Sequence, residues 1–479
     1  MSPLPNVLMI VTDQQRRDTV GAYGSTLCRT PNMDRIAREG MRFDRAYTPT
    51  GLCSPTRASF FAGTYPHTHE VLTNVSLHPI RNSLASAEDR LTPMLARHGY
   101  SLGYVGKWHV NDTQTPLDFG FHDYRSLGDY MAWRTAAGHP VPEAMLDYTR
   151  QRADRDPAPV EASRPAWLCN QAIDLIDRYS TSRERPFLIR LDFHGPHFPN
   201  VIPEPYFSMY PPAEIPPWTN ANDDLANKPA IHRIKKLHWR TDQLSWADWQ
   251  PLLSAYFGEI TLIDAQVGRV LDHLEHTGLA QDTLVVWTTD HGDTAGSHGI
   301  CNKDYTMYEE VYSVPLLVRW PGVAAPGSAC DDYVMHFLDL HATLHALCGE
   351  APLPGCHGQS LIPLLQRTKT VWPRDSAFAE FHGSHMGLYS LRLLRTPRHS
   401  YVYNPNDIDE LYDNESDPAQ LNNLANDPAA RPILETLRRR MVEWMRDTQD
   451  HLFNEWTVDW LTQDPELARA APGRRRTKW

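Results

Sequence analysis

The chain is organised around the stretch Gly51-Leu52-Cys53-Ser54-Pro55-Thr56-Arg57-Ala58-Ser59-Phe60-Phe61-Ala62-Gly63, which contains the pattern C-x-P-x-R. Proline is favoured in the first turn of a helix, so the pattern predicts a helix that begins near the cysteine. A nucleophile at a helix N-terminus lies in a positive local field, which suits an anionic substrate. The alternative is a small buried cysteine, a turn proline and a surface arginine, and the rest of the chain decides between the two.

Other candidate site residues follow predicted strands. The apolar run 6–11 has the length of a strand that is covered on both faces, and it leads into Asp13 and Gln14. In open α/β sheets ligands bind beyond the carboxyl ends of the strands, so this pair lies where a site is expected. Its carboxylate and amide oxygens suit a hard divalent cation, while the alternative role of Asp13 is a helix cap. Further polar candidates in strand ends and loops are Asn74, Lys107, His109, His197, Asp290, His291, His298 and Lys303.

The order of these segments predicts an α/β fold. Buried strands alternate with helices through most of the chain, which favours a large, mainly parallel mixed sheet with helices on both faces. We assign this catalytic domain to residues 1–370, with two irregular insertions, about 112–165 and about 200–245, that shape the pocket. Shorter strands and a helix near the end predict a smaller C-terminal α+β subdomain at 371–460, with a short antiparallel sheet. Residues 461–479 are expected to form a basic tail.

Composition excludes several classes of partner. The chain has 46 Lys and Arg against 58 Asp and Glu, and its net charge of -12 attracts neither nucleic acid nor an anionic membrane. No run predicts a membrane span, and Met1 to Asn6 lacks the basic start of a secretory signal, so we expect a cytoplasmic protein. Seven scattered cysteines fit neither a disulfide framework nor a zinc pattern. No coiled-coil or repeat pattern indicates an oligomeric state, which stays unknown.

The cysteine stretch resembles the signature of the formylglycine-dependent sulfatases, in the alkaline phosphatase superfamily near the phosphonate monoester hydrolase branch. Matching segments occur in the family's order as Asp13-Gln14, Cys53 to Gly63, Gly106-Lys107-Trp108-His109, Pro196-His197, Asp290-His291-Gly292, Lys303 and Asp409 to Leu424. The match departs at Ala62, where the fuller signature has Thr. The resemblance implies that a maturation enzyme oxidises Cys53 to formylglycine, whose hydrate attacks the sulfur of a sulfate ester. The second hydroxyl of the hydrate then lets sulfate leave by elimination.

The resemblance also implies one divalent metal ion, held by Asp13, Gln14, Asp290, His291 and the modified Cys53. Oxygen ligands favour Ca²⁺, and an imidazole ligand admits Mn²⁺. The remaining roles follow by position. Arg57 would hold the modified side chain and a sulfate oxygen, and Lys107 and Lys303 would stabilise charge on the transferring group. His197 would protonate the leaving oxygen, and His109 would remove the proton that triggers elimination. Lys303 is the alternative acid, and Asn74 and His298 are expected to bind substrate.

The expected activity is hydrolysis of a small-molecule or saccharide sulfate monoester to an alcohol and inorganic sulfate. The main alternative is a phosphonate monoester or phosphodiester hydrolase, which shares the cysteine motif, both metal pairs and an asparagine where Asn74 stands. Lys107 and His109 favour the sulfatase, because the phosphonate enzymes have lost both residues. A catalytically inactive homologue that binds a metal or ligand is a third alternative. The aromatic side chains of the second insertion fit sugars, aryl groups and alkyl alcohols alike, so the alcohol stays open.

Overall fold

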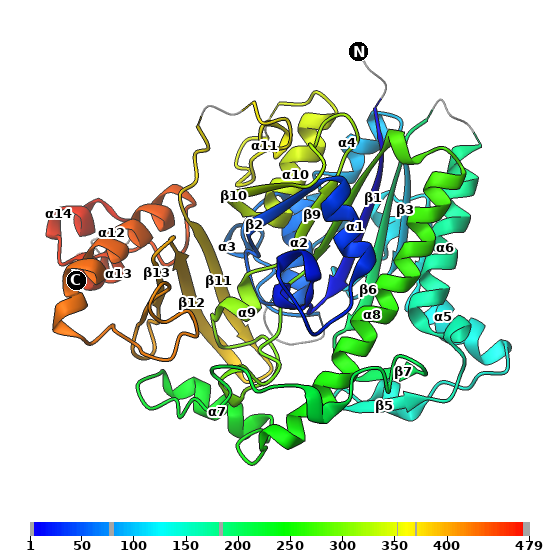
Figure 1. The fold of residues 1–479 in the computed structure, drawn as a ribbon. Coiled ribbons are helices and arrows are strands. Elements are labelled where there is room, and N and C mark those ends of the chain that lie inside the picture. Colours follow the sequence, from blue (N-terminus) through cyan, green and yellow to red (C-terminus); the bar gives the residue numbers. More distant parts are fainter. Residues whose placement is uncertain (1–3, 76–80, 182–184, 352, 369–370, 473–479) are drawn as a thin grey trace.

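The computed structural model describes residues 4–75, 81–181, 185–351, 353–368 and 371–472, and an eight-stranded sheet lies at its centre (Figure 1). In spatial order the strands are β10 (Ser328–Met335), β2 (Met41–Tyr47), β9 (Leu316–Arg319), β8 (Thr283–Thr289), β1 (Asn6–Asp13), β6 (Phe187–Pro196), β3 (Ser101–Gly106) and β4 (Asp123–Ser126). Strand β9 runs antiparallel to both of its neighbours, whereas the other neighbouring pairs are parallel. The expected large, mainly parallel mixed sheet is confirmed.

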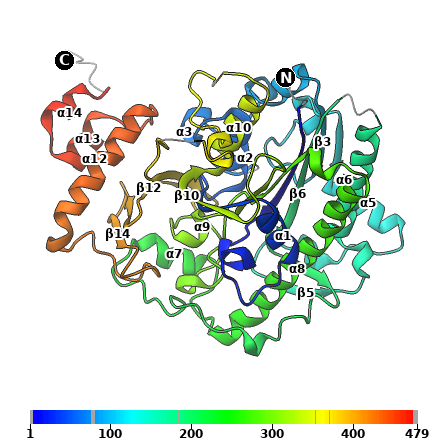
Figure 2. The same cartoon turned by 45° about the horizontal axis from the view of Figure 1, so that its top comes forward.

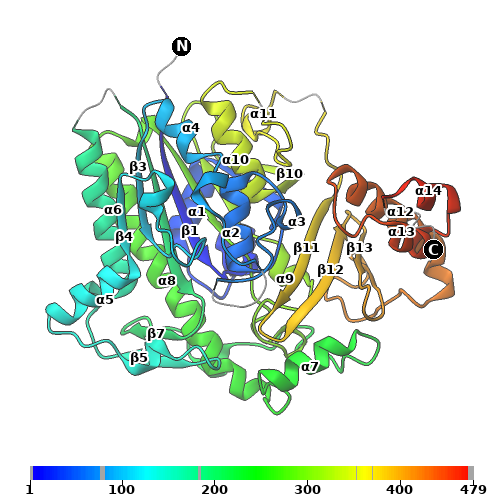
Figure 3. The same cartoon turned by 180° about the vertical axis from the view of Figure 1, so that it is seen from behind.

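Helices cover both faces of this sheet (Figure 3). One layer consists of α1 (Pro31–Glu39), α6 (Arg164–Ser180) and α8 (Trp246–His276), and the other of α2 (Cys53–Ala62), α4 (Thr92–Arg97) and α10 (His336–Leu347). Leu8 and Ile10 of β1 belong to the core of the first layer, and Val7, Met9 and Val11 to the core of the second. Successive side chains of a strand point to opposite faces, which is why the central strand is apolar throughout.

A smaller antiparallel sheet follows near the C-terminus. Its strands, in order, are β11 (Ala377–Ser384), β12 (Gly387–Arg395), β13 (His399–Tyr403) and β14 (Glu410–Asp413). The helices beside it are α12 (Arg431–Asp447), α13 (Glu455–Thr462) and α14 (Pro465–Ala470), and they lie on the side of this sheet away from the large one (Figure 2). Short helices elsewhere are α3 (Pro66–His69), α9 (Glu309–Tyr312) and α11 (Ile362–Leu365). Within the ranges given above, every helix is too short or too polar to cross a membrane.

Three segments differ from the expectation. The first insertion contains β4 and α5 (Leu127–Ala136), and its β5 (Ala153–Asp156) pairs with β7 (Asn200–Pro203), while the second insertion contains α7 (Ala230–His238). The sequence pattern did not predict β4, because this edge strand of sequence DYRS is only half-buried and has no apolar periodicity. The expected basic tail is helical at 465–470, where Ala468 is buried in the C-terminal core. The arginines at 474–476 lie outside the described residues.

A buried ionic cluster joins the C-terminal sheet to the larger part of the chain. His67 of α3 approaches Glu380 of β11 with its Nδ1 2.6 Å from Oε2, and its Nε2 lies 3.0 Å from the Thr448 carbonyl. A carboxylate and a carbonyl only accept hydrogen bonds, so both ring nitrogens donate and His67 is an imidazolium cation. Arg392 and Asp450 complete this cluster, which we call the His67 cluster, through two hydrogen bonds of 2.6 and 2.9 Å.

We expect the His67→Gln variant to remove one pH dependence of stability. Burial opposes protonation, but Glu380 raises the pKa of His67 above its ordinary value. A raised native pKa stabilises the fold fully below the unfolded value of about 6.5, and this contribution is lost as the pH rises through the native pKa. Breaking one partner of such a buried pair costs about 3–5 kcal/mol. Urea unfolding of the variant and of the unsubstituted protein, from acidic to alkaline pH, measures the difference between their free energies of unfolding. We expect this difference to shrink at alkaline pH.

The neighbouring imidazoles do not obscure this result. Burial, as the largest cause, lowers the pKa of His69 to about 3 and that of His382 to about 4, so neither titrates in the same window. His276→Gln at the exposed end of α8 is the matched control and should leave the pH profile of unfolding unchanged. A constant difference between His67→Gln and the unsubstituted protein at every pH would show that His67 is not charged.

Candidate active site

The site forms where parallel strands end at one edge of the large sheet. Asp13 ends β1, and Lys107 and Asp290 follow directly after β3 and β8. Strand β3 can pass close to β6 because Gly106 has a φ of 105° and no side chain. A Cβ there would lie 1.9 Å from the Asp192 carbonyl, which accepts a hydrogen bond from the Lys107 amide. The glycine therefore fixes where the Lys107 side chain begins.

Cys53 is the first residue of α2 and lies within this edge. One ligand atom from each of Asp13, Cys53, Asp290 and His291 lies within 4.8 Å of the other three, and all four residues are buried. The Cys53 sulfur is 3.2 Å from His291 Nε2 and 3.8 Å from Asp13 Oδ1. Residues from three distant parts of the chain thus form one compact cluster, which we call the Cys53 cluster.

The Cys53 cluster has the donor atoms that a divalent cation needs. His291 Nδ1 lies 2.9 Å from the Gly292 carbonyl and donates to it, so Nε2 is the ring nitrogen that can bind a cation once it carries no proton. Burial and then the charge of Asp13 raise the pKa of Asp290 to about 6. Two desolvated carboxylates repel each other, and a cation between them relieves that repulsion. Carboxylate oxygens and an imidazole nitrogen fit Ca²⁺ or Mn²⁺.

Gln14 reaches the edge of this cluster through a network that the sequence did not reveal. Its Oε1 accepts a hydrogen bond from Lys303 Nζ at 2.6 Å, and its Nε2 donates to Asp293 Oδ2 at 2.6 Å. The backbone of Gln14 has a φ of 66° and donates to Asp290 Oδ1 at 3.1 Å. Gln14 therefore ties Lys303 to the carboxylates. The motif Asp290-His291-Gly292-Asp293 contains the signal for this role, a second acid three residues after the first.

Arg57 lies against the same carboxylates, and its side chain is wholly buried. Its guanidinium is 3.1 Å from Asp13, 2.8 Å from Asp192 and 2.9 Å from Asp290, and it also donates to the Lys107 carbonyl at 3.1 Å. Four hydrogen bonds hold the guanidinium among these acceptors. Arg57 thus orients the cluster, and its expected contact with a sulfate oxygen stays a prediction. Asp192 was missed, although a single carboxylate within an apolar strand signals a buried ionic partner.

The remaining charged candidates surround the Cys53 cluster. Lys107 Nζ donates to Asp13 Oδ2 at 2.6 Å. Burial opposes ionisation of the thiol, but nearby cations, above all Lys107 and Lys303, lower the pKa of Cys53 well below its usual value. An anionic group at this position is therefore stabilised by the site.

Two histidines, His109 and His197, are the remaining candidates near the Cys53 cluster. His197 Nδ1 lies 2.6 Å from the Phe198 carbonyl and donates to it, which leaves Nε2 to carry a mobile proton. Burial and the charge of Lys303 lower the pKa of His197 well below its ordinary value. Burial and Lys107 likewise lower the pKa of His109, a residue with a φ of 52°. Both rings are therefore neutral in the absence of an anionic ligand.

The two residues expected to bind substrate have different surroundings. Asn74 Oδ1 accepts a hydrogen bond from the Ser54 amide at 3.0 Å, so it caps α2 beside Cys53. His298 is instead 2.6 Å from Asp223 and stacks on Tyr308 with ring centroids 3.7 Å apart. Among the described residues, the contacts of its ring involve none of the Cys53 cluster, so the structure does not bring His298 to that cluster, and its expected role in binding substrate stays a prediction. It shares a loop with Lys303, but a tight turn at φ 56° orients the ring elsewhere.

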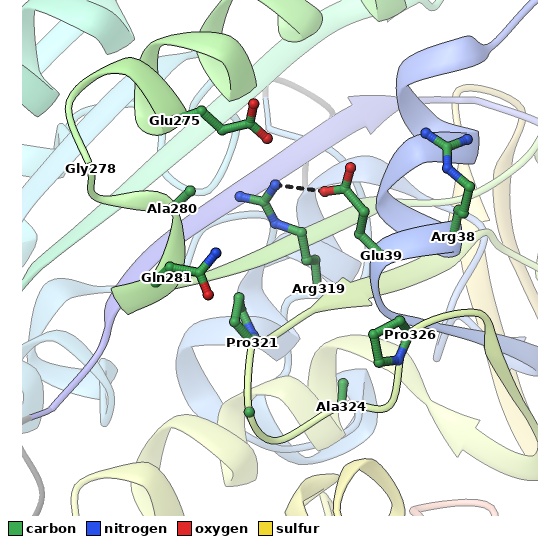
Figure 4. A pocket seen from close by; sticks show the side chains of 11 residues that line it. Arg38, Glu39, Glu275, Gly278, Ala280, Gln281, Arg319, Pro321, Ala324 and Pro326 are labelled. Carbon is green, nitrogen blue, oxygen red and sulfur yellow. Dashed lines mark hydrogen bonds and ion pairs between the residues drawn. The ribbon is translucent and has the colours of Figure 1, made fainter.

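A cavity of about 480 Å³ lies beside the Cys53 cluster, and Lys107, His109 and His197 form part of its wall. A larger hollow of about 650 Å³ lies at the opposite edge of the sheet, where Glu39, Gln281 and Arg319 precede or end strands (Figure 4). It contains an ion pair between Arg319 and Glu39 and none of the candidate site residues. The smaller cavity is therefore the one that adjoins the chemistry.

Comparisons with known proteins identify the family of this chain. The model of the family described as Sulfatase matches residues 5–350, and a model described as N-sulphoglucosamine sulphohydrolase, C-terminal, matches residues 296–447. An arylsulfatase of Clostridium perfringens is 27% identical over 93% of this chain and 95% of its own, and a choline-sulfatase of Rhizobium meliloti is 29% identical over 88% and 83%. The crystal structure of a phosphonate monoester hydrolase of Agrobacterium radiobacter, 25% identical, superposes with a TM-score of 0.79 over 94% of this chain and 97% of that one. Since one family model spans most of the chain, the protein belongs to the sulfatase family.

Proposed function

We propose that the protein hydrolyses sulfate monoesters to an alcohol and inorganic sulfate, with Cys53 converted to formylglycine by a maturation enzyme. The observation that carries this proposal is the convergence of Cys53, Asp13, Asp290 and His291 within 4.8 Å at the N-terminus of α2. A helix N-terminus and the ammonium groups of Lys107 and Lys303 favour a sulfate group there. We further propose that residues 1–370 form the catalytic domain and that a subdomain begins at 371.

Asp13, Asp290 and His291 would hold one divalent metal ion, with Gln14 and the modified Cys53 as further ligands. When bound, the ion polarises the sulfate ester and favours ionisation of the hydrated aldehyde. Asp13 uses Oδ2 for Lys107 and Arg57, while its Oδ1 faces Cys53. Ca²⁺ suits the carboxylate oxygens, and Mn²⁺ is the alternative that His291 permits.

The side chains around this cluster divide the remaining work. Lys107 and Lys303 would stabilise negative charge on the sulfuryl oxygens, at about 3 kcal/mol each. A bound sulfate ester brings negative charge close to His197, which raises the pKa of its ring and makes it the acid for the leaving oxygen. Lys303 is the alternative acid. His109 would remove the proton that triggers sulfate release, since its Nδ1 is buried without a hydrogen-bond partner in the described structure.

A phosphonate monoester hydrolase is the second candidate, and the superposition on the Agrobacterium enzyme favours it. We prefer the sulfatase because Lys107 and His109 both line the cavity beside Cys53. The test is release of sulfate or phosphonate from a matched pair of aryl esters by protein co-produced with a maturation enzyme. Mass spectrometry of the Cys53 peptide verifies the aldehyde. Faster hydrolysis of the phosphonate ester would reverse our preference, and an aldehyde-loaded protein inert to both would indicate a binding homologue.

We expect the affinity for a divalent metal ion to fall as the pH drops below about 6. With its pKa raised to about 6, Asp290 binds a proton that the cation must displace at lower pH. Calorimetric titration of the metal-free protein with Ca²⁺ and with Mn²⁺ measures this and ranks the two ions. Asp290→Asn should abolish binding.

Asp89 supplies the matched control, because burial raises the pKa of this carboxyl to about 6 as well. It hydrogen-bonds Thr92 at the start of α4 and belongs to no metal cluster found among the described residues. Asp89→Asn should keep both the affinity and its pH dependence. An affinity that is equal at pH 5 and pH 7.5 would contradict the assignment of Asp290 as a ligand.

A further inference from the structure

The cavity beside the Cys53 cluster decides which alcohols the site accepts, if the proposed function holds. Lys107, His109 and His197 form the wall nearest to Cys53. A sulfate group placed against Cys53 and Lys107 therefore directs its alcohol into this volume, past the ring that would protonate the leaving oxygen. The cavity, at about 480 Å³, is of the size that binds one small organic ligand.

The wall of this cavity is almost free of charge. Among its described lining residues Lys107 is the one with a full charge, and its ammonium is already 2.6 Å from Asp13. His194 also lines the cavity, and burial together with the charge of Arg164 lowers its pKa well below the ordinary value. Arg164 itself is buried and is not part of the wall. A carboxylate or second sulfate in this cavity would lose water without gaining a cationic partner.

Aromatic rings form one side of the cavity. Tyr148 and His194 lie with ring centroids 5.5 Å apart and share a hydrogen bond of 3.2 Å, and His194 lies 5.2 Å from His197. Tyr148 is 43% exposed, so it stands at the entrance, whereas His194 is buried. Tyr124 and Trp108 add two further rings to the lining. Aromatic faces stack on flat aryl groups and on the apolar faces of sugar rings.

We propose that this cavity selects sulfate esters of uncharged ring alcohols that carry a single sulfate, and rejects esters whose alcohol carries a carboxylate or a second sulfate. The ring stacks on Tyr148, and the ester oxygen faces His197. A phenol and a neutral hexose share this chemistry, and separate substrates distinguish them.

The experiment compares kcat/KM of the aldehyde-loaded enzyme for four esters: 4-nitrophenyl sulfate, galactose 6-sulfate, a hexuronate 2-sulfate and glucosamine 2-N,6-O-disulfate. We expect at least one of the first two to exceed both of the others by about 100-fold or more. Tyr148→Ala should raise KM for that ester about tenfold and should lower kcat/KM for that ester more than it lowers kcat/KM for acyclic ethyl sulfate. Comparable turnover of the neutral and the charged esters would overturn the proposal.

A charge-gain variant tests the electrostatic part directly. Gly128 lines the cavity from the first turn of α5, and a Cβ there would meet Ser126 Oγ at 3.3 Å and nothing closer. Gly128→Arg adds a cation to the wall and should reduce the preference for the neutral ester at least tenfold. Ala132→Arg adds the same charge to an exposed position of the same helix, outside the lining, and should leave the preference unchanged. Equal preferences in the two variants would contradict the proposal.

Failure of this inference is distinguishable from failure of the proposed function. An enzyme that cleaves all four esters alike keeps the function and loses the inference. If no ester is cleaved, the dissociation constants of the four esters for Cys53→Ala protein still test the cavity. Neutral esters that bind no more tightly than charged ones in that assay would overturn it.

Discussion

Replacing Cys53 with alanine is expected to lower kcat for sulfate release by roughly four orders of magnitude or more, the scale found when a covalent nucleophile is removed. Alanine cannot be oxidised to the aldehyde, and water alone cannot replace a nucleophile held at the N-terminus of α2. Because Cys53 is small and buried, the thermal midpoint should change little. Sulfate release, measured by ion chromatography on protein whose fold is verified by circular dichroism, provides the test.

Cys348 offers the matched control for this substitution. It is a partly buried cysteine at the end of α10, and burial raises the pKa of its thiol to about 11. The Cys348→Ala variant should keep full activity, and its Cys53 should still be converted to the aldehyde. A Cys53→Ala enzyme with more than about a hundredth of the original kcat would show that another group attacks sulfur.

Replacing Arg57 with glutamine is expected to have the largest effect on stability. The guanidinium forms ion pairs with Asp13, Asp192 and Asp290, and all four side chains are wholly buried. Removing one partner of a buried ion pair costs about 3–5 kcal/mol, and here three carboxylates lose their common cation. We expect a fall of at least that size in the free energy of unfolding, measured in urea, together with loss of high-affinity metal binding.

A variant of Arg134 separates the loss of stability from the loss of metal binding. It is also fully buried and forms two hydrogen bonds of 2.6 and 2.7 Å with Asp156, but it lies outside the Cys53 cluster. Arg134→Gln should lower stability by a similar mechanism and leave metal affinity intact. If Arg57→Gln kept its metal affinity while Arg134→Gln lost it, the assigned role of Arg57 would be wrong.

The sequence predicts the site where two strong signals coincide. Long apolar runs identify β1 and β8 as buried strands, and the rule that ligands bind beyond their carboxyl ends places Asp13 and Asp290 together. Cys53 is identified by its spacing to Pro55 and Arg57. Both signals are local in the chain, and the parallel connections of the sheet convert them into proximity.

Other features depend on side-chain direction or on contacts between distant segments, which a local pattern does not contain. His298 and Lys303 lie five positions apart in one loop, yet the first packs on Tyr308 and the second donates to Gln14. Asp192 becomes part of the site only because β6 lies beside β1 and β3. Strand β4 forms at an edge that its own polar residues do not reveal.

The His67 cluster restricts how this protein can be recombined with its relatives. A chimera that joins the first 370 residues to a foreign C-terminal module would bury the cation of His67 without its counter-ion unless the donor supplies a carboxylate at the place of Glu380. The donor would also need an acid to match Arg392 if it kept that arginine, as Asp450 does here. The C-terminal part can therefore be exchanged only for one whose buried charges match those of the first 370 residues.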